Sequence, residues 1–252
     1  MDQNFNGKVA LITGGTSGIG LAISKELAKL GCKICISYSQ SDKKAAITKK
    51  ELEQFTNEVL LIKSDISNEQ AVIELFTKIK NQYQKLDYLI NNAGIDLPQA
   101  FEDFSFKDWK KIIDINLNGK FLAIKNAIPL LKNSEDARVI NISSRLSQKP
   151  LLEASAYCCS QAGIEMLTKV AALELCKYNI KVNTISPGFT KTPLTEGIYI
   201  NKEFWEKSAV ANPSKRVGDP IDTANTVVFL LSSKSNYING VSIHVNGGSH
   251  LG

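Results

Sequence analysis

The chain has 252 residues, 43% of them hydrophobic, which is enough for one large α/β domain with a substantial core. Its net charge is only +5, and its lysines are spread along the chain, so we expect no nucleic-acid groove. No apolar run approaches the roughly 18 residues of a membrane helix. The N-terminus lacks the features of a signal peptide, and we expect a cytoplasmic protein.

Short apolar runs alternate with segments of helical periodicity along the whole chain. The runs are 8–13, 33–38, 59–63, 87–91, 137–142, 180–185 and 241–245. Continuous apolar strands separated by helices are typical of a parallel sheet that is covered on both faces. This pattern predicts that residues 1–252 form one doubly wound α/β domain with a seven-stranded parallel sheet.

Several helix ends are marked by residues with known capping preferences. Gly31 follows the helical segment 18–30 and is a natural C-terminal stop. Ser67 and Gln70 have the spacing of a capping box, and Ser105 has the character of another helix start.

Cysteine and histidine usage argues against disulfides and metal sites. The five cysteines are an odd number, which favours free thiols in a cytosolic chain. Cys32 and Cys35 form a C-x-x-C, but they fall in a segment that is expected to be a strand. The two histidines, His244 and His250, lack Cys–His metal spacing, so no metal is expected.

A glycine-rich turn, TGGTSGIG (13–20), joins the first expected strand to a helix. Such a turn lets backbone N–H groups approach a pyrophosphate at a helix N-terminus. A merely tight turn is the alternative, but the strand–turn–helix context is the one that the motif requires. We therefore predict dinucleotide binding here. The expected contacts are Gly14, Thr16, Ser17, Gly18, Ile19 and Gly20.

Further motifs follow in a fixed order. They are NNAG (91–94), DINLNG (114–119), NISS (141–144) before Tyr157, IKVNTISPG (180–188) and VNGG (245–248). Together with the Gly-x3-Gly-x-Gly spacing, they resemble the short-chain dehydrogenase/reductase family over the whole chain. The nearest likeness is to bacterial 3-oxoacyl-carrier-protein reductase-like members.

The resemblance implies a single-domain Rossmann fold that moves a hydride between a nicotinamide dinucleotide and a carbonyl carbon. It implies cofactor contacts, besides the glycine turn, at Tyr38, Ser39, Asp65, Ile66, Asn92, Ala93, Gly94, Tyr157, Gln161, Pro187, Gly188 and Thr192. It also implies Asn116, Ser144 and Tyr157 as catalytic residues, with Ser144 at the family spacing before Tyr157 and Ser143 in strand-end packing.

The family's Tyr-x3-Lys motif is altered, because Gln161 occupies the lysine position, and Gln161 thus joins the catalytic set. In the family this lysine holds the nicotinamide ribose and lowers the tyrosine pKa. A free tyrosine titrates near ~10, and a close cation lowers a pKa by about 1–3 units, which corresponds to about 1.4–4 kcal/mol. Alcohol oxidation, which needs the tyrosinate, should therefore suffer more than carbonyl reduction.

Three functions remain open. One is an NADP(H)-dependent reductase of 3-oxoacyl groups or similar ketones, weak or specialised. Another is a catalytically impaired relative that acts as a binding or partner subunit of a hetero-oligomer. The third is non-redox chemistry, such as dehydration, in the same pocket.

The second expected strand ends without the acid that accepts ribose hydroxyls in NAD-specific proteins. No acid occurs before Asp42, and Ser39 can donate a hydrogen bond to a phosphate. Lys43 and Lys44 lie nearby, with solvated surface as the simpler role, and Ser17 replaces the basic loop residue of many NADP-preferring members. The pattern favours NADP(H) over NAD(H).

A variable segment at about 193–213 is expected to cover the substrate pocket. It carries Ile198, Tyr199, Phe204 and Trp205, which either line a partly apolar pocket or only pack the segment down. Arg145 either meets an anionic substrate or is exposed. We expect a small-molecule substrate, free or bound to an acyl carrier. By family resemblance we expect a homo-oligomer, a tetramer or dimer, with a hetero-oligomer as the alternative.

Overall fold

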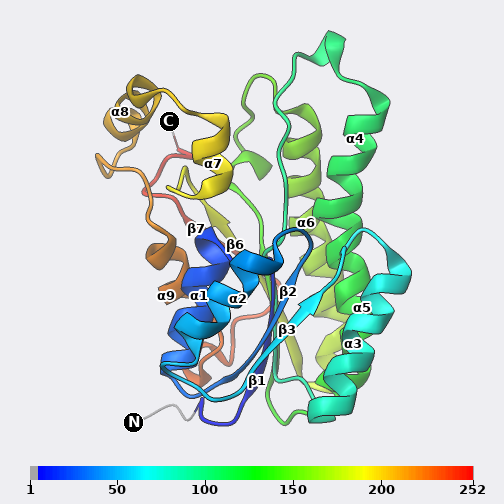
Figure 1. The fold of residues 1–252 in the computed structure, drawn as a ribbon. Helices are drawn as coiled ribbons and strands as arrows, with labels where there is room; N and C mark the ends of the chain where they lie inside the picture. The colour runs from blue at the N-terminus through cyan, green and yellow to red at the C-terminus, as the bar shows by residue number, and fades with distance from the viewer. Residues whose placement is uncertain (1–4, 252) are drawn as a thin grey trace.

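The computed structural model describes residues 5–251 (Figure 1). One parallel sheet runs through it in the order β3-β2-β1-β4-β5-β6-β7. The strands are β1 (Val9–Thr13), β2 (Lys33–Tyr38), β3 (Val59–Lys63), β4 (Tyr88–Asn91), β5 (Ala137–Ile142), β6 (Ile180–Pro187) and β7 (Ser242–Val245). The predicted doubly wound, seven-stranded sheet is confirmed, and each strand lies within one or two residues of its expected range.

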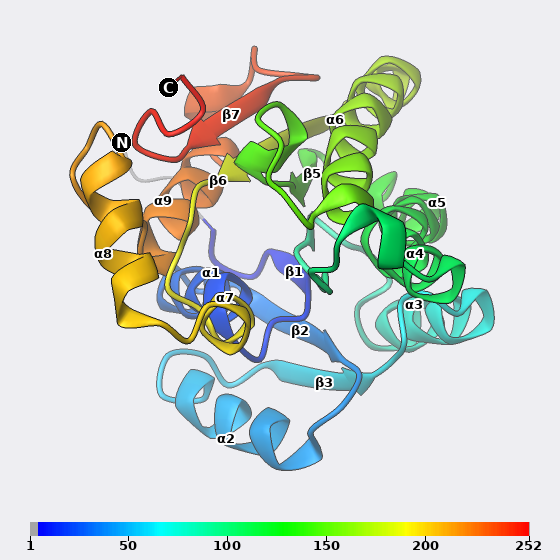
Figure 2. The same ribbon diagram turned by 90° about the horizontal axis from the view of Figure 1, so that it is seen from above.

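Helices cover both faces of the sheet (Figures 1 and 2). The helices are α1 (Gly18–Lys29), α2 (Asp42–Leu52), α3 (Glu69–Tyr83), α4 (Phe106–Ile113), α5 (Gly119–Leu131), α6 (Ser155–Leu175), α7 (Pro193–Ile198), α8 (Lys202–Ala211) and α9 (Pro220–Leu230). Strand β1 shows why both faces are apolar: Leu11 packs into the core with α3, α5 and α6, whereas Ile12 packs into the core with α1 and α9.

The connection pattern places a crevice at the carboxyl ends of the central strands. The chain moves outward from β1 to β2 and β3 and then returns to β4, which pairs with the other side of β1. Ligands of open α/β sheets bind at such a switch point. The glycine turn after β1 and the NNAG motif after β4 both lie there.

Two of the three sequence-derived helix ends are confirmed, and one is wrong. Gly31 has a φ of +86° just after α1, and the Ser105 side chain accepts a hydrogen bond from the Asp108 amide at the start of α4. The capping box at Ser67 does not form, because the Ser67 amide and hydroxyl both bond to Asp65 Oδ1, at 2.9 and 2.7 Å. Asn68 caps α3 instead, in an arrangement that the Ser/Thr-x-x-Glu/Gln pattern does not describe.

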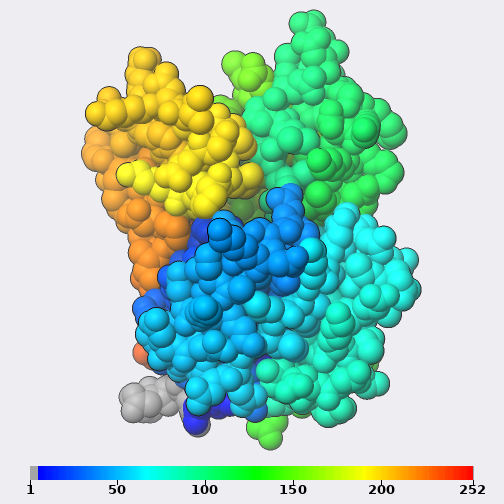
Figure 3. All heavy atoms as spheres, in the orientation of Figure 1, coloured from blue at the N-terminus to red at the C-terminus, as the bar shows by residue number. Residues whose placement is uncertain are grey.

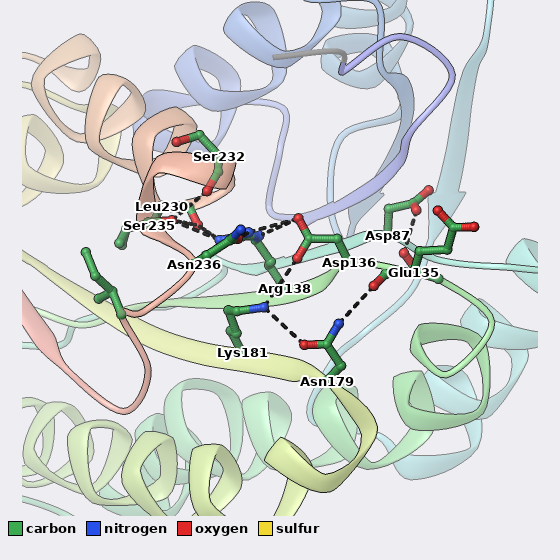
Figure 4. Close-up of polar contacts among 12 residues, drawn as sticks. Asp87, Glu135, Asp136, Arg138, Asn179, Lys181, Leu230, Ser232, Ser235 and Asn236 are labelled. Atoms are coloured by element: carbon green, nitrogen blue, oxygen red, sulfur yellow. Dashed lines mark hydrogen bonds and ion pairs between the residues drawn. The ribbon is translucent and has the colours of Figure 1, made fainter. Parts of the chain in front are cut away.

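A buried polar cluster ties the sheet together at the end opposite the crevice (Figure 4). Arg138, at the start of β5, is 1% exposed and donates to Asp136 Oδ2 at 2.8 Å. It also donates to the Leu230 carbonyl at 3.0 Å, to Ser235 Oγ at 2.8 Å and to Asn236 Oδ1. A buried guanidinium is tolerated because it is paired and hydrogen-bonded, and here it joins β5 to the end of α9.

Among residues 5–251, no helix is long and apolar enough to cross a membrane. The same residues bring no three His, Cys, Asp or Glu side chains together as a metal site. All five cysteines are free, and burial raises the pKa of Cys32 and of Cys35 to about 12, so neither thiol is activated.

Candidate active site

A cavity of about 710 Å³ opens at the carboxyl ends of the strands. Except for Gly20, every residue for which we expected a cofactor contact lines it. In the view from above, β1 is central, with α7 on one side and α4 and α6 on the other (Figure 2). The volume lies within the range of small-molecule and cofactor sites.

The glycine turn is shaped for close backbone approach. Gly14 and Gly18 have φ values of +65° and +52°, which side chains rarely adopt, and α1 begins at Gly18. Gly20 does not line the cavity, and a Cβ there would collide with the Gly14 carbonyl and the Asn92 amide. Its missing side chain lets α1 pack against the strand ends, while Gly14 and the residues from Thr16 to Ile19 line the cavity.

The NNAG motif clamps β4 to β1 behind the cavity. The amides of Asn92 and Ala93 both donate to Thr13 Oγ1, at 3.0 and 3.1 Å. The Asn92 side chain donates to the Thr13 carbonyl at 3.0 Å. These bonds fix the wall along which a dinucleotide would lie. The turn shape, the helix N-terminus and the cavity volume together fit this group.

At the far end of the cavity, past β2, the wall carries Tyr38, Ser39 and Lys44. Asp42 does not line it, because its carboxylate binds the Lys63 ammonium at 2.9 Å and the Tyr38 hydroxyl at 3.0 Å. The hydrogen bond from Lys63 lowers the pKa of Asp42. This end of the cavity therefore presents a cation and hydroxyls.

Ser144 and Tyr157 line both this cavity and a smaller adjoining pocket. The Ser144 side chain lies near enough to the Tyr157 phenol to lower its pKa. Burial raises the pKa of Tyr157, the charge of Asp96 raises it further, and the Ser144 side chain opposes both effects. Tyr157 is thus held as a phenol. Ser143 instead donates to the Gln161 carbonyl at 3.0 Å, in the packing role expected for it.

Asn116 lies in a π-helical turn (Asp114–Asn118) between α4 and α5 and is fully buried. Its Oδ1 accepts from the Ile95 amide at 2.8 Å, and its Nδ2 donates to the Ile95 carbonyl at 2.9 Å and to Ser160 Oγ at 3.2 Å. The side chain does not line the cavity. The predicted catalytic role of Asn116 stays a prediction, and its hydrogen bonds to Ile95 tie this side chain to the loop after β4.

The smaller pocket contains two charged groups that do not pair with each other. Asp96 Oδ1 is buried without a hydrogen-bond partner, and burial raises the pKa of this carboxyl to about 6. Arg145 is only 8% exposed and lies over the Phe189 ring at 4.6 Å. Arg145 is therefore not an ordinary exposed residue, and sequence reasoning missed Asp96 entirely.

The segment 193–213 forms α7 and α8 beside this pocket. In Figure 3 its surface stands across the top of the molecule from that of α4. Ile198 and Tyr199 line the pocket. Phe204 stacks on Tyr199 at 4.1 Å, and Trp205 Nε1 donates to the Tyr199 carbonyl at 2.8 Å. Both sequence interpretations hold in part, because two residues line the pocket and two pack the segment down.

A family model described as enoyl-(acyl carrier protein) reductase matches residues 14–250. The chain belongs to the short-chain dehydrogenase/reductase family. LinX of Sphingobium indicum, a 2,5-dichloro-2,5-cyclohexadiene-1,4-diol dehydrogenase, is 35% identical over the full length of both chains. FabG of Aquifex aeolicus, a 3-oxoacyl-[acyl-carrier-protein] reductase, is 33% identical over 98% of this chain and 99% of its own.

Solved structures of the short-chain dehydrogenase/reductase family share the fold. RhlG of Pseudomonas aeruginosa, solved as an active-site complex with NADP, has a TM-score of 0.92 and 30% identity. The match covers 99% of this chain and all of that chain. The named relatives are oxidoreductases, so the protein belongs to an oxidoreductase family.

At position 161, where the sequence motif led us to expect a lysine, the side chain is an uncharged glutamine. Gln161 is 3% exposed, lines the large cavity, and donates from Nε2 to Ser160 Oγ at 3.1 Å. A cation does line the same cavity from α5: Lys120, which sequence reasoning also missed. The sequence places Lys120 one helical turn after Asn116, but it does not show that the side chain is buried. The burial results from the packing of α5.

Proposed function

We propose that the protein is an NADP(H)-dependent oxidoreductase that reduces a carbonyl group to an alcohol. The observation that carries the proposal is that Ser144 and Tyr157 line both the large cavity and the small pocket that adjoins it. A bound dinucleotide would supply the hydride from its nicotinamide ring. The pocket would hold the carbonyl, with its oxygen between the two hydroxyls.

The protonation state of Tyr157 suits reduction. Because burial and Asp96 raise its pKa, the phenol keeps its proton at neutral pH and can donate it to the oxygen of the new alcohol. Ser144 would hold the same oxygen. The reverse reaction needs the tyrosinate, which this environment disfavours.

The cavity end beyond β2 supports NADP(H) over NAD(H). The Asp42 carboxylate is paired to Lys63 and does not line the cavity, so it would not repel a ribose phosphate there, and Lys44 could neutralise such a phosphate.

We expect Lys44→Met to weaken NADPH binding about threefold to tenfold and to leave NADH binding nearly unchanged, as for a partly screened charge-assisted contact. Titration calorimetry with both cofactors measures this. Lys43→Met is the matched control, because Lys43 is next to Lys44 in the sequence but does not line the cavity. Equal losses for the two cofactors would contradict the assignment.

The smaller pocket supports a polar, anionic substrate. Arg145 offers an unpaired guanidinium, Asp96 a desolvated acceptor, and Ile198 with Tyr199 an apolar wall. Buried charges favour a ligand that pairs with them. A small ketone with a carboxylate and a hydroxyl group fits this arrangement. A 3-oxoacyl group, the substrate class in the name of the FabG relative, is the competing candidate.

We expect Arg145→Met to raise KM about tenfold or more for a carboxylated ketone and to leave KM for its methyl ester almost unchanged. NADPH consumption over a panel of acids, matched methyl esters and 3-oxoacyl thioesters tests both the reaction and its substrate class. Activity with thioesters alone would favour the acyl substrate. A protein that binds NADPH and turns over none of the panel would favour the partner-subunit alternative, which the uncharged Gln161 supports.

The remaining features fit this function. Residues 1–252 form one proposed catalytic domain, with α7 and α8 as its substrate lid.

The outer faces of α5 and α6 expose Phe121, Met166, Val170 and Leu173, which supports a homo-oligomer, dimer or tetramer, over an isolated monomer. Light scattering that returned a monomer at micromolar concentration would refute this. The five free cysteines support a cytoplasmic location.

A further inference from the structure

Lys120 is a buried cation without a negative partner. It lies in the first turn of α5, is 2% exposed, and donates from Nζ to the Ala93 carbonyl at 2.8 Å. Within residues 5–251 no carboxylate forms an ion pair with it. An ammonium carries three N–H donors, so a single carbonyl leaves it incompletely satisfied. Its side chain also lines the large cavity.

Such a group destabilises an empty site. Burial of an unpaired ammonium is costly, and it lowers the pKa of Lys120 to about 7. An apolar side chain of similar length would fill the same space without this cost. The site therefore has a surplus positive charge that a ligand with oxygen acceptors would satisfy.

Hydrogen bonds lead from Gln161, at the position of the family's lysine, to Asn116, which precedes Lys120 in the chain. Gln161 Nε2 bonds to Ser160 Oγ at 3.1 Å, and Ser160 Oγ accepts from Asn116 Nδ2 at 3.2 Å. Asn116 is one helical turn before Lys120, so the two residues lie on the same side of the helix. Gln161, Lys120 and Ala93 line one cavity.

We propose that Lys120 supplies, from α5, the positive charge that position 161 on α6 lacks, by donating to a ribose hydroxyl of the bound dinucleotide. The inference rests on the proposed function, because it assumes that the cavity holds a nicotinamide dinucleotide. Lys120 thus acts as a cofactor-binding residue.

The charge on Lys120 makes cofactor binding depend on pH. Because its pKa in the empty protein is about 7, raising the pH above 7 removes the ammonium before the dinucleotide binds. Binding then requires proton uptake, so affinity falls as pH rises. Without Lys120, this dependence disappears.

Other charged or titratable groups lie around the same cavity. The charged or titratable side chains that face it are Asp65 after β3, Lys44 on α2, Lys111 on α4 and Tyr157 on α6. Glu69 on α3 pairs with Lys125 on α5. The carboxyl of Asp96, in the adjoining pocket, titrates near pH 6, as does a ribose phosphate. A range of pH 7–9 therefore isolates Lys120.

Calorimetric titration of the full-length protein with NADPH, in buffers of different ionisation enthalpy, measures both affinity and proton uptake. We expect the Kd of the wild type to rise more than tenfold between pH 7 and 9, with proton uptake on binding. Lys120→Met should bind weakly at pH 7, with no pH dependence and no proton uptake. Lys111→Met, which removes an exposed charge from the same cavity, should keep both. A pH-independent wild type would overturn the proposal while leaving dinucleotide binding intact, whereas no binding at all would overturn both.

Two further measurements test the proposal. They are the melting temperature of the Lys120→Met variant and the NADPH affinity of a variant in which the side chains at positions 120 and 161 are exchanged. The empty Lys120→Met protein should have a higher melting temperature than the wild type, because a buried cation is lost. A lower melting temperature would assign Lys120 a structural role instead. The double variant Lys120→Gln with Gln161→Lys should regain at pH 8 most of the NADPH affinity that Lys120→Gln loses. No rescue would show that the two positions do not serve the same group.

Discussion

Tyr157→Phe should lower both carbonyl reduction and alcohol oxidation by about 10²–10⁴-fold, the contribution expected of a positioned acid–base group. The phenol is the group that can donate a proton to the oxygen of the new alcohol, and Phe removes the hydroxyl while keeping the ring volume. NADPH affinity should change by less than about threefold to tenfold, the scale of one lost neutral hydrogen bond. Initial rates in both directions and calorimetric Kd values measure this.

Tyr199→Phe is the matched control for this change. Tyr199 lines the same small pocket, but unlike Tyr157 it does not line the large cavity. We expect it to change KM and to leave kcat within a few-fold. If the Tyr157 variant retained wild-type rates in both directions, the assigned mechanism would be wrong.

The sequence predicted the fold because a doubly wound sheet has a strong local signature. A strand such as β5 is buried on both faces, so all of its residues are buried and the run is easily recognised. Helix starts were harder, because Ser67 and Asn68 are adjacent and both can cap a helix. Only the hydrogen bonds of the Asp65 turn show that Ser67 is already engaged.

The site could be predicted where its residues follow strands directly. Ser144 and the NNAG motif come after β5 and β4, and the carboxyl ends of parallel strands meet in one crevice. Lys120 and Asp96 could not be found this way. Whether a lysine on a helix snorkels to solvent or is buried depends on what packs above it, here the loop at Ala93. The clamping role of Asn116 depends likewise on the π-helical turn.

Gln161→Lys should raise alcohol oxidation about tenfold to a thousandfold, and carbonyl reduction much less. An ammonium at position 161, one helical turn from Tyr157, would lower the tyrosine pKa by about 1–3 units and thus favour the base needed for oxidation. Initial rates in both directions measure the effect.

Gln161→Met is the control for shape, since it is similar in length and uncharged, and it should give no gain. The competing physical outcome is that the new ammonium finds no acceptor. Position 161 is only 3% exposed, so an unpaired charge there would lower the melting temperature and leave the rates unchanged. A destabilised protein that stays inactive on the whole substrate panel would show that the site has diverged beyond one residue, and it would favour a partner-subunit role over catalysis.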